Sequence, residues 1–342
     1  MPNALNSGFW QGRPVLVTGA TGLIGGWLVK ELLERGAEVV ILLRDRTPNC
    51  LLAVEGLLQR LTVVEGCVRD QALLRRAMSE YSVDTVFHLA AQPLVGVAKL
   101  DPVGTLEVNV QGTWQVLEAA RQSRVSQVLI ASSDKAYGAS ADLPYHETHP
   151  LRGAYPYDVS KSCADLIARM YASTYGLRVG ITRCANLFGG GDFNLSRTIP
   201  GLIRATWRGQ RFAIRSDGLF VRDYLYVKDA ADAYLVLAEH LAGDAALSGE
   251  AFNFSLAIRL TVLDLVRKVL ELMDRTDLEP IIQNIASAEI REQYLNCEKA
   301  RERLAWRPRY TLERGLQETI DWYLALFEHR HGRKQRPAPQ SV

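Results

Sequence analysis

Cysteine is scarce in this chain and never closely paired. Only five cysteines are present in 342 residues, and they are Cys50, Cys67, Cys163, Cys184 and Cys297. Disulfide frameworks and structural zinc sites use closely spaced cysteines, so this scattered, odd-numbered set excludes both kinds of scaffold. The pattern is typical of a reducing compartment, and we predict a cytoplasmic protein.

Excess charge of one sign and long apolar runs are also missing. Forty lysine and arginine residues face 38 aspartate and glutamate residues, a formal net charge of +2. This balance, without a clustered basic patch, argues against nucleic acid as a partner. No run approaches the roughly 18 uninterrupted apolar residues of a membrane span, and the first residues lack the segments of a secretion signal. We therefore expect no membrane partner.

Histidine and lysine are scarce as well. The pairs His146/His149 and His329/His331 have no carboxylate or thiolate at ligand spacing, so we predict no metal site. Only eight of the 40 basic residues are lysines. A lysine at a chemically informative position is therefore less easily explained by chance.

The first 185 residues alternate short β-branched runs with helical patterns. The predicted strands are Val15–Thr18, Glu38–Leu43, Leu61–Glu65, Thr85–Leu89, Val128–Ala131 and Val179–Thr182. Strand and helix in strict rotation predict an α/β protein with a Rossmann-type, doubly wound parallel sheet. We assign residues 1–185 to a dinucleotide-binding domain.

After Asn186 this rotation stops. A glycine-rich loop follows at Gly189–Asn194, and the predicted helices beyond it are Ile199–Arg208, Asp229–Leu241, Leu263–Met273 and Leu312–Phe327. We expect residues 186–225 and 257–328 to form a smaller, mixed α/β C-terminal lobe that binds substrate, with 226–256 returning to the first domain. The basic, proline-bearing stretch 329–342 predicts a flexible tail.

A glycine loop follows the first predicted strand and precedes a helical pattern. Glycines three apart at such a turn let the backbone approach a pyrophosphate, whose charge lies at the helix N-terminus. The predicted cofactor contacts here are Gly19, Thr21, Gly22, Leu23, Ile24 and Gly25. Further on, Asp45 would hold the ribose hydroxyls of NAD, whereas Arg44 would favour the 2′-phosphate of NADP. The sequence predicts NAD but leaves NADP open.

Tyr157 and Lys161 are four residues apart in a predicted helix, on one face. An ammonium beside a phenol lowers the pKa of the phenol, which makes the tyrosine a usable base toward an alcohol. Ser132–Gly138 follows the fifth predicted strand, at the carboxyl edge where such folds bind ligands. A serine hydroxyl there could share a proton with the phenol and the substrate oxygen.

Together these motifs resemble the extended short-chain dehydrogenase/reductase family of nucleotide-sugar enzymes, the NAD-dependent epimerases and dehydratases. The matching segments are the glycine loop, His88–Ala91, Asn109–Thr113, Ser132–Gly138, Tyr157 with Lys161, and Arg222–Tyr224. The resemblance implies that Leu89, Ala90 and Ala91 also contact the cofactor. It further implies a homodimer formed through helices at about Thr105–Gln122 and Tyr155–Tyr175.

Within this family, the two residues after the serine separate subgroups. The 4-epimerases usually have small neutral residues there, whereas the CDP-glucose 4,6-dehydratases carry Asp-Lys, as this chain does at Asp134-Lys135. The resemblance therefore implies a nucleotide-sugar 4,6-dehydratase that converts CDP-glucose to its 4-keto-6-deoxy product. The alternatives are a 4-epimerase or another epimerase of the family, or a dehydratase of dTDP-glucose or GDP-mannose.

The resemblance also implies the roles of the residues. Tyr157, helped by Lys161 and Ser133, would remove the C4 hydroxyl proton while hydride leaves C4. Lys135 would be the base at C5 and Asp134 the acid at C6, unless the two merely form a salt bridge in a loop. The implied contacts to the nucleotide-diphosphate hexose are Gln92, Tyr137, Asn186, Arg197, Arg222 and Arg291, with a packing role equally open for Tyr137.

Overall fold

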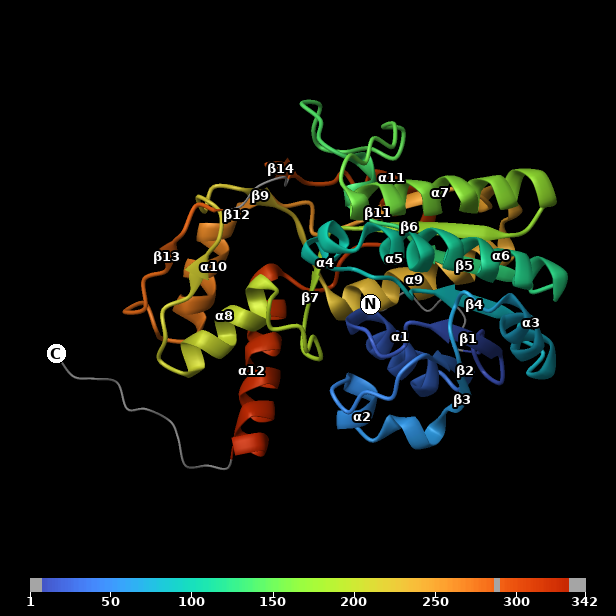
Figure 1. The fold of residues 1–342 in the computed structure, drawn as a ribbon, viewed down its shortest axis with the longest axis horizontal. Coiled ribbons are helices and arrows are strands. Elements are labelled where there is room, and N and C mark those ends of the chain that lie inside the picture. Colours follow the sequence, from blue (N-terminus) through green and yellow to red (C-terminus); the bar gives the residue numbers. More distant parts are fainter. Residues whose placement is uncertain (1–7, 286–289, 332–342) are drawn as a thin grey trace.

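A seven-stranded parallel sheet with helices on both faces forms the larger part of the molecule (Figure 1). The computed structural model describes residues 8–285 and 290–331. In sheet order the strands are β11 (Ala251–Phe254), β6 (Val179–Cys184), β5 (Gln127–Ala131), β4 (Thr85–His88), β1 (Pro14–Thr18), β2 (Glu38–Leu43) and β3 (Thr62–Glu65). Every neighbouring pair is parallel, and the predicted Rossmann-type fold is confirmed.

Both faces of the sheet are buried because successive side chains of each strand point to opposite sides. In β1, Val15 and Val17 join one apolar core, whereas Leu16 joins the other. The helices on the Val15 side are α1 (Leu23–Glu34) and α9 (Val227–Gly243). Those on the Leu16 side are α3 (Gln71–Glu80), α6 (Gly112–Gln122) and α7 (Pro156–Tyr175).

The helix predicted at Thr105–Gln122 contains an irregular turn. Helix α5 (Pro102–Leu106) continues into α6 through a π-helical turn, Glu107–Gln111, a feature often found at functional sites. The turn carries the buried Asn109, whose side-chain amide donates to the Gln92 carbonyl at 3.1 Å and to Ser160 Oγ at 2.9 Å. This amide fixes the loop after β4 against α7.

A smaller C-terminal lobe lies beside the sheet, on the left in Figure 1. Its helices are α8 (Thr198–Trp207), α10 (Val262–Leu272) and α12 (Leu312–His331), and they share an apolar core with Leu23 and Trp27 of α1. Its strands pair as β7 (Asn186–Phe188) with β10 (Tyr224–Tyr226), β8 (Ala213–Ile214) with β13 (Ile281–Ile282), and β9 (Val221–Arg222) with both β12 (Leu260–Thr261) and β14 (Glu292–Gln293).

The chain enters the lobe after β6 and returns to the sheet before its end. Helix α9 packs on α1, and β11 then pairs with β6 from Ala251–Ile181 to Phe254–Cys184. Helix α12 reaches His331, so the first three residues of the predicted tail are helical, and 332–342 lie outside the described residues. Among the residues described, no helix is both long and apolar enough to cross a membrane.

The remaining elements are short. The helices are α2 (Leu51–Val54), α4 (Val95–Leu100) and α11 (Glu298–Leu304), and the single 3-10 turns are η1 (Leu57–Arg60), η3 (Asp134–Tyr137) and η4 (Ala245–Leu247). Turn η3 directly follows β5 at the carboxyl edge of the sheet and places its residues at the border between the sheet and the lobe.

Candidate active site

One pocket runs along the carboxyl ends of the strands, between the sheet and the C-terminal lobe. The residues predicted to be catalytic all line it: Ser133, Asp134, Lys135, Tyr157 and Lys161. Ten of the eleven predicted cofactor contacts outside that group also line it: Gly19, Thr21, Gly22, Leu23, Ile24, Arg44, Asp45, Leu89, Ala90 and Ala91. Three predicted substrate contacts, Asn186, Arg197 and Arg222, line the pocket as well.

The glycine loop has the backbone that a pyrophosphate site needs. Gly19 has a positive φ of 75°, and a Cβ there would lie 2.6 Å from the Ala90 nitrogen. A Cβ on Gly25 would lie 2.1 Å from the Gly19 carbonyl oxygen, so Gly25 packs behind the loop and is not in the pocket wall. Its contact with the cofactor stays a prediction. Helix α1 then begins without a side-chain cap on its first N–H groups. These residues therefore fit a dinucleotide.

Directly after strand β2, Arg44 and Asp45 pair with each other. Arg44 Nε donates to Asp45 Oδ2 at 2.6 Å, and both side chains are about two-thirds exposed. Both residues line the pocket, so either is available to a ribose hydroxyl or a phosphate. Cys67 lies in the same wall.

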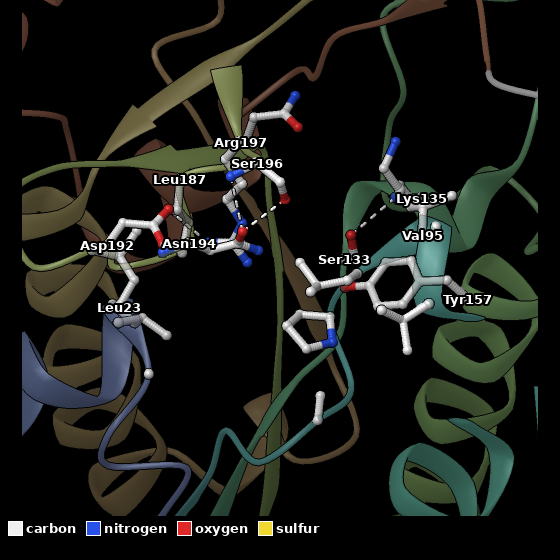
Figure 2. Close-up of a pocket in the computed structure, with 18 of the residues that line it drawn as sticks. Leu23, Val95, Ser133, Lys135, Tyr157, Leu187, Asp192, Asn194, Ser196 and Arg197 are labelled. Carbon is white, nitrogen blue, oxygen red and sulfur yellow. Dashed lines mark hydrogen bonds and ion pairs between the residues drawn. The ribbon is translucent and has the colours of Figure 1, made fainter. Parts of the chain in front are cut away.

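Tyr157 and Ser133 face each other across the carboxyl end of β5. Figure 2 shows Ser133, Lys135 and Tyr157 on one side of the pocket, opposite Asp192, Asn194 and Arg197. Burial raises the pKa of Tyr157 to about 12, the nearby Asp134 adds to this, and a hydrogen bond with the Ser133 side chain acts in the opposite direction. The predicted net lowering of this pKa is therefore wrong, because burial outweighs the favourable contacts.

Lys161 is on the same helix face as Tyr157, as predicted from their spacing. Its ammonium donates to the Ala131 carbonyl at 2.8 Å and lies 6.0 Å from the centroid of the Tyr157 ring. Burial lowers the pKa of Lys161 to about 8. Burial, together with the Lys161 charge, lowers the pKa of His88 to about 3, so that histidine stays neutral at ordinary pH.

Asp134 and Lys135 occupy the start of turn η3. Asp134 is 3% exposed, and burial raises the pKa of its carboxyl while the Lys135 charge lowers it. Its Oδ1 accepts from Ser133 Oγ at 3.1 Å, whereas Oδ2 is buried without a hydrogen-bond partner among the described residues. An unpartnered buried carboxylate oxygen is costly unless the carboxyl is protonated or a ligand reaches it.

Sequence reasoning missed a further acid in this wall, Asp158. Asp158 is 3% exposed, lines the pocket, and follows Tyr157 in the first turn of α7. Burial raises its pKa to about 6, with the Lys135 charge lowering it and the Asp134 charge raising it. Its place directly after the tyrosine was the signal that could have revealed it.

Two predicted substrate contacts turn away from the pocket. Tyr137 is 1% exposed, and its hydroxyl donates to Asn253 Oδ1 at 2.7 Å and accepts from Arg183 at 2.9 Å. Gln92 donates from its side-chain amide to the Leu94 carbonyl and to Thr105 Oγ1. Neither residue lines the pocket wall, because each hydrogen-bonds inside the protein. These contacts favour the packing role that the sequence left open for Tyr137, and substrate contact by either residue stays a prediction.

Arg291 is also outside the pocket wall. It lies on the surface near Asp217, 3.4 Å away, and its guanidinium is 6.0 Å from the centroid of the Phe220 ring. The side chain is 65% exposed and directed toward a surface carboxylate, and its contact with the substrate stays a prediction.

The other predicted substrate contacts of the wall belong to the lobe side. Arg197 pairs with Asp192 at 2.9 Å. Arg222 is 8% exposed and donates from Nη1 to the carbonyls of Val221 and Arg291. Asn186 donates from its amide to the Asp223 carbonyl at 3.0 Å. Among the described residues, no cluster of three or more histidine, cysteine, aspartate or glutamate side chains could hold a metal ion.

Comparison with known families and proteins agrees with this geometry. The model of the NAD dependent epimerase/dehydratase family matches residues 15–254. The CDP-glucose 4,6-dehydratase of Salmonella typhimurium is 31% identical over 335 residues, which cover 94% of this chain and 93% of that protein.

Two solved structures show the same fold. A double mutant of the dTDP-glucose 4,6-dehydratase DesIV from Streptomyces venezuelae, with NAD bound, is 28% identical with a TM-score of 0.84, covering 92% of this chain and 98% of that one. The UDP-glucose 4-epimerase of Thermotoga maritima with UDP-glucose is also 28% identical, with a TM-score of 0.83 and coverage of 92% and 100%.

Proposed function

The chain belongs to the NAD-dependent epimerase/dehydratase family, and on that premise we propose that it is a nucleotide-sugar 4,6-dehydratase. The observation that carries the proposal is the position of Asp134 and Lys135, which line one pocket with Tyr157 and Lys161. An epimerase needs only the tyrosine and its helpers, whereas loss of water needs a further acid and base beside the sugar.

The first step is oxidation at C4 of the hexose. NAD, when bound at the glycine loop, supplies the acceptor for the C4 hydride and later returns the hydride to C6. Tyr157 takes the proton of the C4 hydroxyl. Because burial raises the pKa of this phenol, the phenolate depends on the hydrogen bond with Ser133 and on the Lys161 ammonium close to the ring.

The second step is elimination of water across C5 and C6. The new C4 ketone makes the C5 proton acidic, and Lys135 Nζ removes it. The C6–oxygen bond breaks, and the departing hydroxyl takes a proton from Asp134 and leaves as water. Burial raises the pKa of Asp134, which favours the protonated carboxyl that this role needs.

We propose CDP-glucose as the substrate, since the Salmonella relative is a CDP-glucose 4,6-dehydratase and this chain carries the Asp-Lys pair. Arg222, Arg197 and Asn186 would contact the diphosphate from the lobe side of the pocket, where all three line the wall. Guanidinium groups suit this role because they bind phosphate oxygens in pairs.

We also propose that two copies associate through α6 and α7, which pack side by side. Large apolar side chains on these helices face solvent in the single chain: Trp114 is 41%, Leu166 55% and Met170 41% exposed. Such a patch is typical of an interface. Leu166→Glu with Met170→Glu should give monomers by light scattering. If the unmodified protein is already monomeric, the pairing proposal fails.

We also propose a cytoplasmic location, which the five free thiols suit.

The deciding experiment is incubation with CDP-, dTDP-, UDP- and GDP-hexoses. A 4-keto-6-deoxy product absorbs in strong alkali, whereas an epimer does not. With CDP-glucose, we expect the unmodified protein to give the alkaline chromophore and the Tyr157→Phe control to give none. Formation of an epimer without the chromophore would replace the dehydratase proposal, and a chromophore from dTDP-glucose alone would correct the nucleotide. The mass of any nucleotide that copurifies provides an independent check.

A further inference from the structure

The side chain of Lys135 is hydrogen-bonded to a residue of the C-terminal lobe. Its Nζ donates to Oε1 of Gln293 across 3.1 Å, although the two residues are 158 positions apart in sequence. Gln293 is fully buried and belongs to strand β14 of the C-terminal lobe. In Figure 2 the amine of Lys135 points away from the Tyr157 ring.

The backbone around Gln293 is hydrogen-bonded both before and after this residue. Gln293 is in register with Arg222 of β9, and the Val221 N–H donates to the Arg291 carbonyl at 3.0 Å. Two positions beyond Gln293, the Leu295 N–H donates to Asp223 Oδ2 at 3.1 Å. The amide oxygen of Gln293 is therefore presented from a rigid backbone, as a positioning group requires.

The nitrogen of this amide differs from its oxygen. Gln293 Nε2 is buried without a hydrogen-bond partner among the described residues. An apolar side chain would fill the same space without leaving a donor unmet. What the amide adds is its oxygen, and the described partner of that oxygen is Lys135.

The charge of the partner matters because Lys135 must lose a proton before it can act as a base. The charged groups around it are Asp134 on its own turn and Asp158 on α7, both of which interact with its charge, and Arg222 of β9 beside Asp134. A further carboxylate at position 293 would favour the ammonium form. A glutamine can orient the nitrogen without adding negative charge.

We propose that Gln293 is a positioning residue for Lys135: its neutral carbonyl oxygen holds the amine at the pocket wall and leaves that amine able to act as the base at C5. This inference rests on the proposed function, in which Lys135 removes the C5 proton. It assigns a role in the elimination step to a two-residue strand of the lobe.

Steady-state kinetics of two variants test the proposal. Gln293→Met removes the acceptor at similar volume, and kcat for dehydration should fall about 10- to 100-fold with KM nearly unchanged, since a misplaced group costs rate more than binding. Gln293→Glu should move the acidic limb of the kcat profile about 1 to 2 pH units higher, because the carboxylate stabilises the ammonium. Gln293→Asn, one methylene shorter, should lie between the unmodified protein and Gln293→Met.

A matched control is Gln127→Met. Gln127 is also a buried glutamine with one unpartnered amide atom, but it contacts Thr85 at the opposite end of β5. Its substitution should leave the pH profile in place. If Gln293→Met and Gln293→Glu also keep the kcat and the pH profile of the unmodified protein, the positioning role is wrong.

A second measurement does not depend on turnover. Reductive methylation with 13C-formaldehyde labels the lysines, and Lys135→Met identifies the signal of Lys135. In Gln293→Glu that signal should titrate at higher pH than in the unmodified protein; identical titrations would overturn the inference. If the unmodified protein dehydrates no nucleotide hexose, the proposed function fails, and this titration still decides whether Gln293 controls Lys135.

Discussion

Two buried polar clusters meet at turn η3, and they differ in how completely their hydrogen bonds are met. The closed cluster contains Tyr137, Arg183, Asp165 and Asn253. Arg183 donates from Nε and Nη2 to the two carboxylate oxygens of Asp165 at 2.8 and 2.9 Å and from Nη1 to the Tyr137 hydroxyl. That hydroxyl in turn donates to Asn253. Each of these four side chains therefore has a hydrogen-bond partner inside the protein.

The open cluster begins three residues earlier in the same turn, at Asp134. Asp134 Oδ2, Ser132 Oγ and Gln293 Nε2 are buried without hydrogen-bond partners among the described residues, and Asp134 lines the pocket. A satisfied network stabilises the fold, whereas an unsatisfied one retains groups that a ligand can engage. Within one short turn, Tyr137 therefore belongs to a network that stabilises the fold, and Asp134 belongs to a group that a ligand can engage.

Lys135→Met should have the largest effect, and on chemistry alone. Dehydration is expected to fall about 10³- to 10⁴-fold because the base at C5 is lost. Hydride transfer from C4 should persist and be visible as reduced nicotinamide, and the melting temperature should change little. Lys268→Met, at a lysine that pairs with Glu313 on the surface, is the control. Dehydration that survives in Lys135→Met would show that another group is the base.

Arg183→Met should act on stability instead. It leaves the fully buried Asp165 with Arg169, 3.1 Å away, as its remaining ion-pair partner. The loss of the buried guanidinium is expected to cost about 3 kcal/mol of unfolding free energy. Chemical denaturation measures this loss. The double variant Arg183→Met with Asp165→Leu removes both charges and should recover much of it. If the single variant is as stable as the unmodified protein, the closed cluster does not hold the fold.

Tyr137→Phe should have a smaller effect, because it removes only one hydroxyl from the closed cluster. The expected loss is about 1 to 2 kcal/mol, as Asn253 and Arg183 each lose one partner. The KM for the nucleotide sugar should stay within a few-fold of its original value. A large rise in KM with unchanged stability would instead place Tyr137 at the substrate, as the sequence predicted.

The smallest expected effect is the pH dependence contributed by Asp158. Burial raises the pKa of its carboxyl from 3.8 to about 6 in the folded protein, so the folded state binds a proton that the unfolded state has released. Its contribution to stability is therefore present below pH 3.8 and lost as the pH rises through about 6. Unfolding free energies should show the unmodified protein losing more stability than Asp158→Asn over this interval, because only the unmodified protein has this carboxyl to ionise. If the unfolding free energies of the two proteins change equally with pH, burial does not raise the pKa of Asp158.

Most of the sheet and the coenzyme loop could be predicted because their signals are local. The buried strands are continuous apolar runs, and all six predicted strands are present with bounds that differ by no more than two residues. The glycine loop likewise needs only its own residues and the strand before it, and the positive φ of Gly19 is the conformation that its glycine permits.

What could not be predicted depends on long-range contacts. Sequence places Lys135 and Tyr137 in one turn, but the direction of each side chain is set by partners such as Gln293 and Arg183. Gln293 is in a strand of two residues, too short for any periodic pattern to indicate. Gln92 was assigned to the substrate by resemblance, whereas its amide closes its own loop onto Leu94.

The late arrival of β11 has a consequence for biosynthesis. Strand β6 is paired by β5 on one side, but its other neighbour is not available until the ribosome has made Phe254, after much of the lobe. Until then the nascent chain presents an unpaired strand edge, which invites aggregation or the binding of a chaperone. A chain terminated after Cys184 would keep that edge permanently, so the coenzyme-binding half is not expected to survive as an independent fragment.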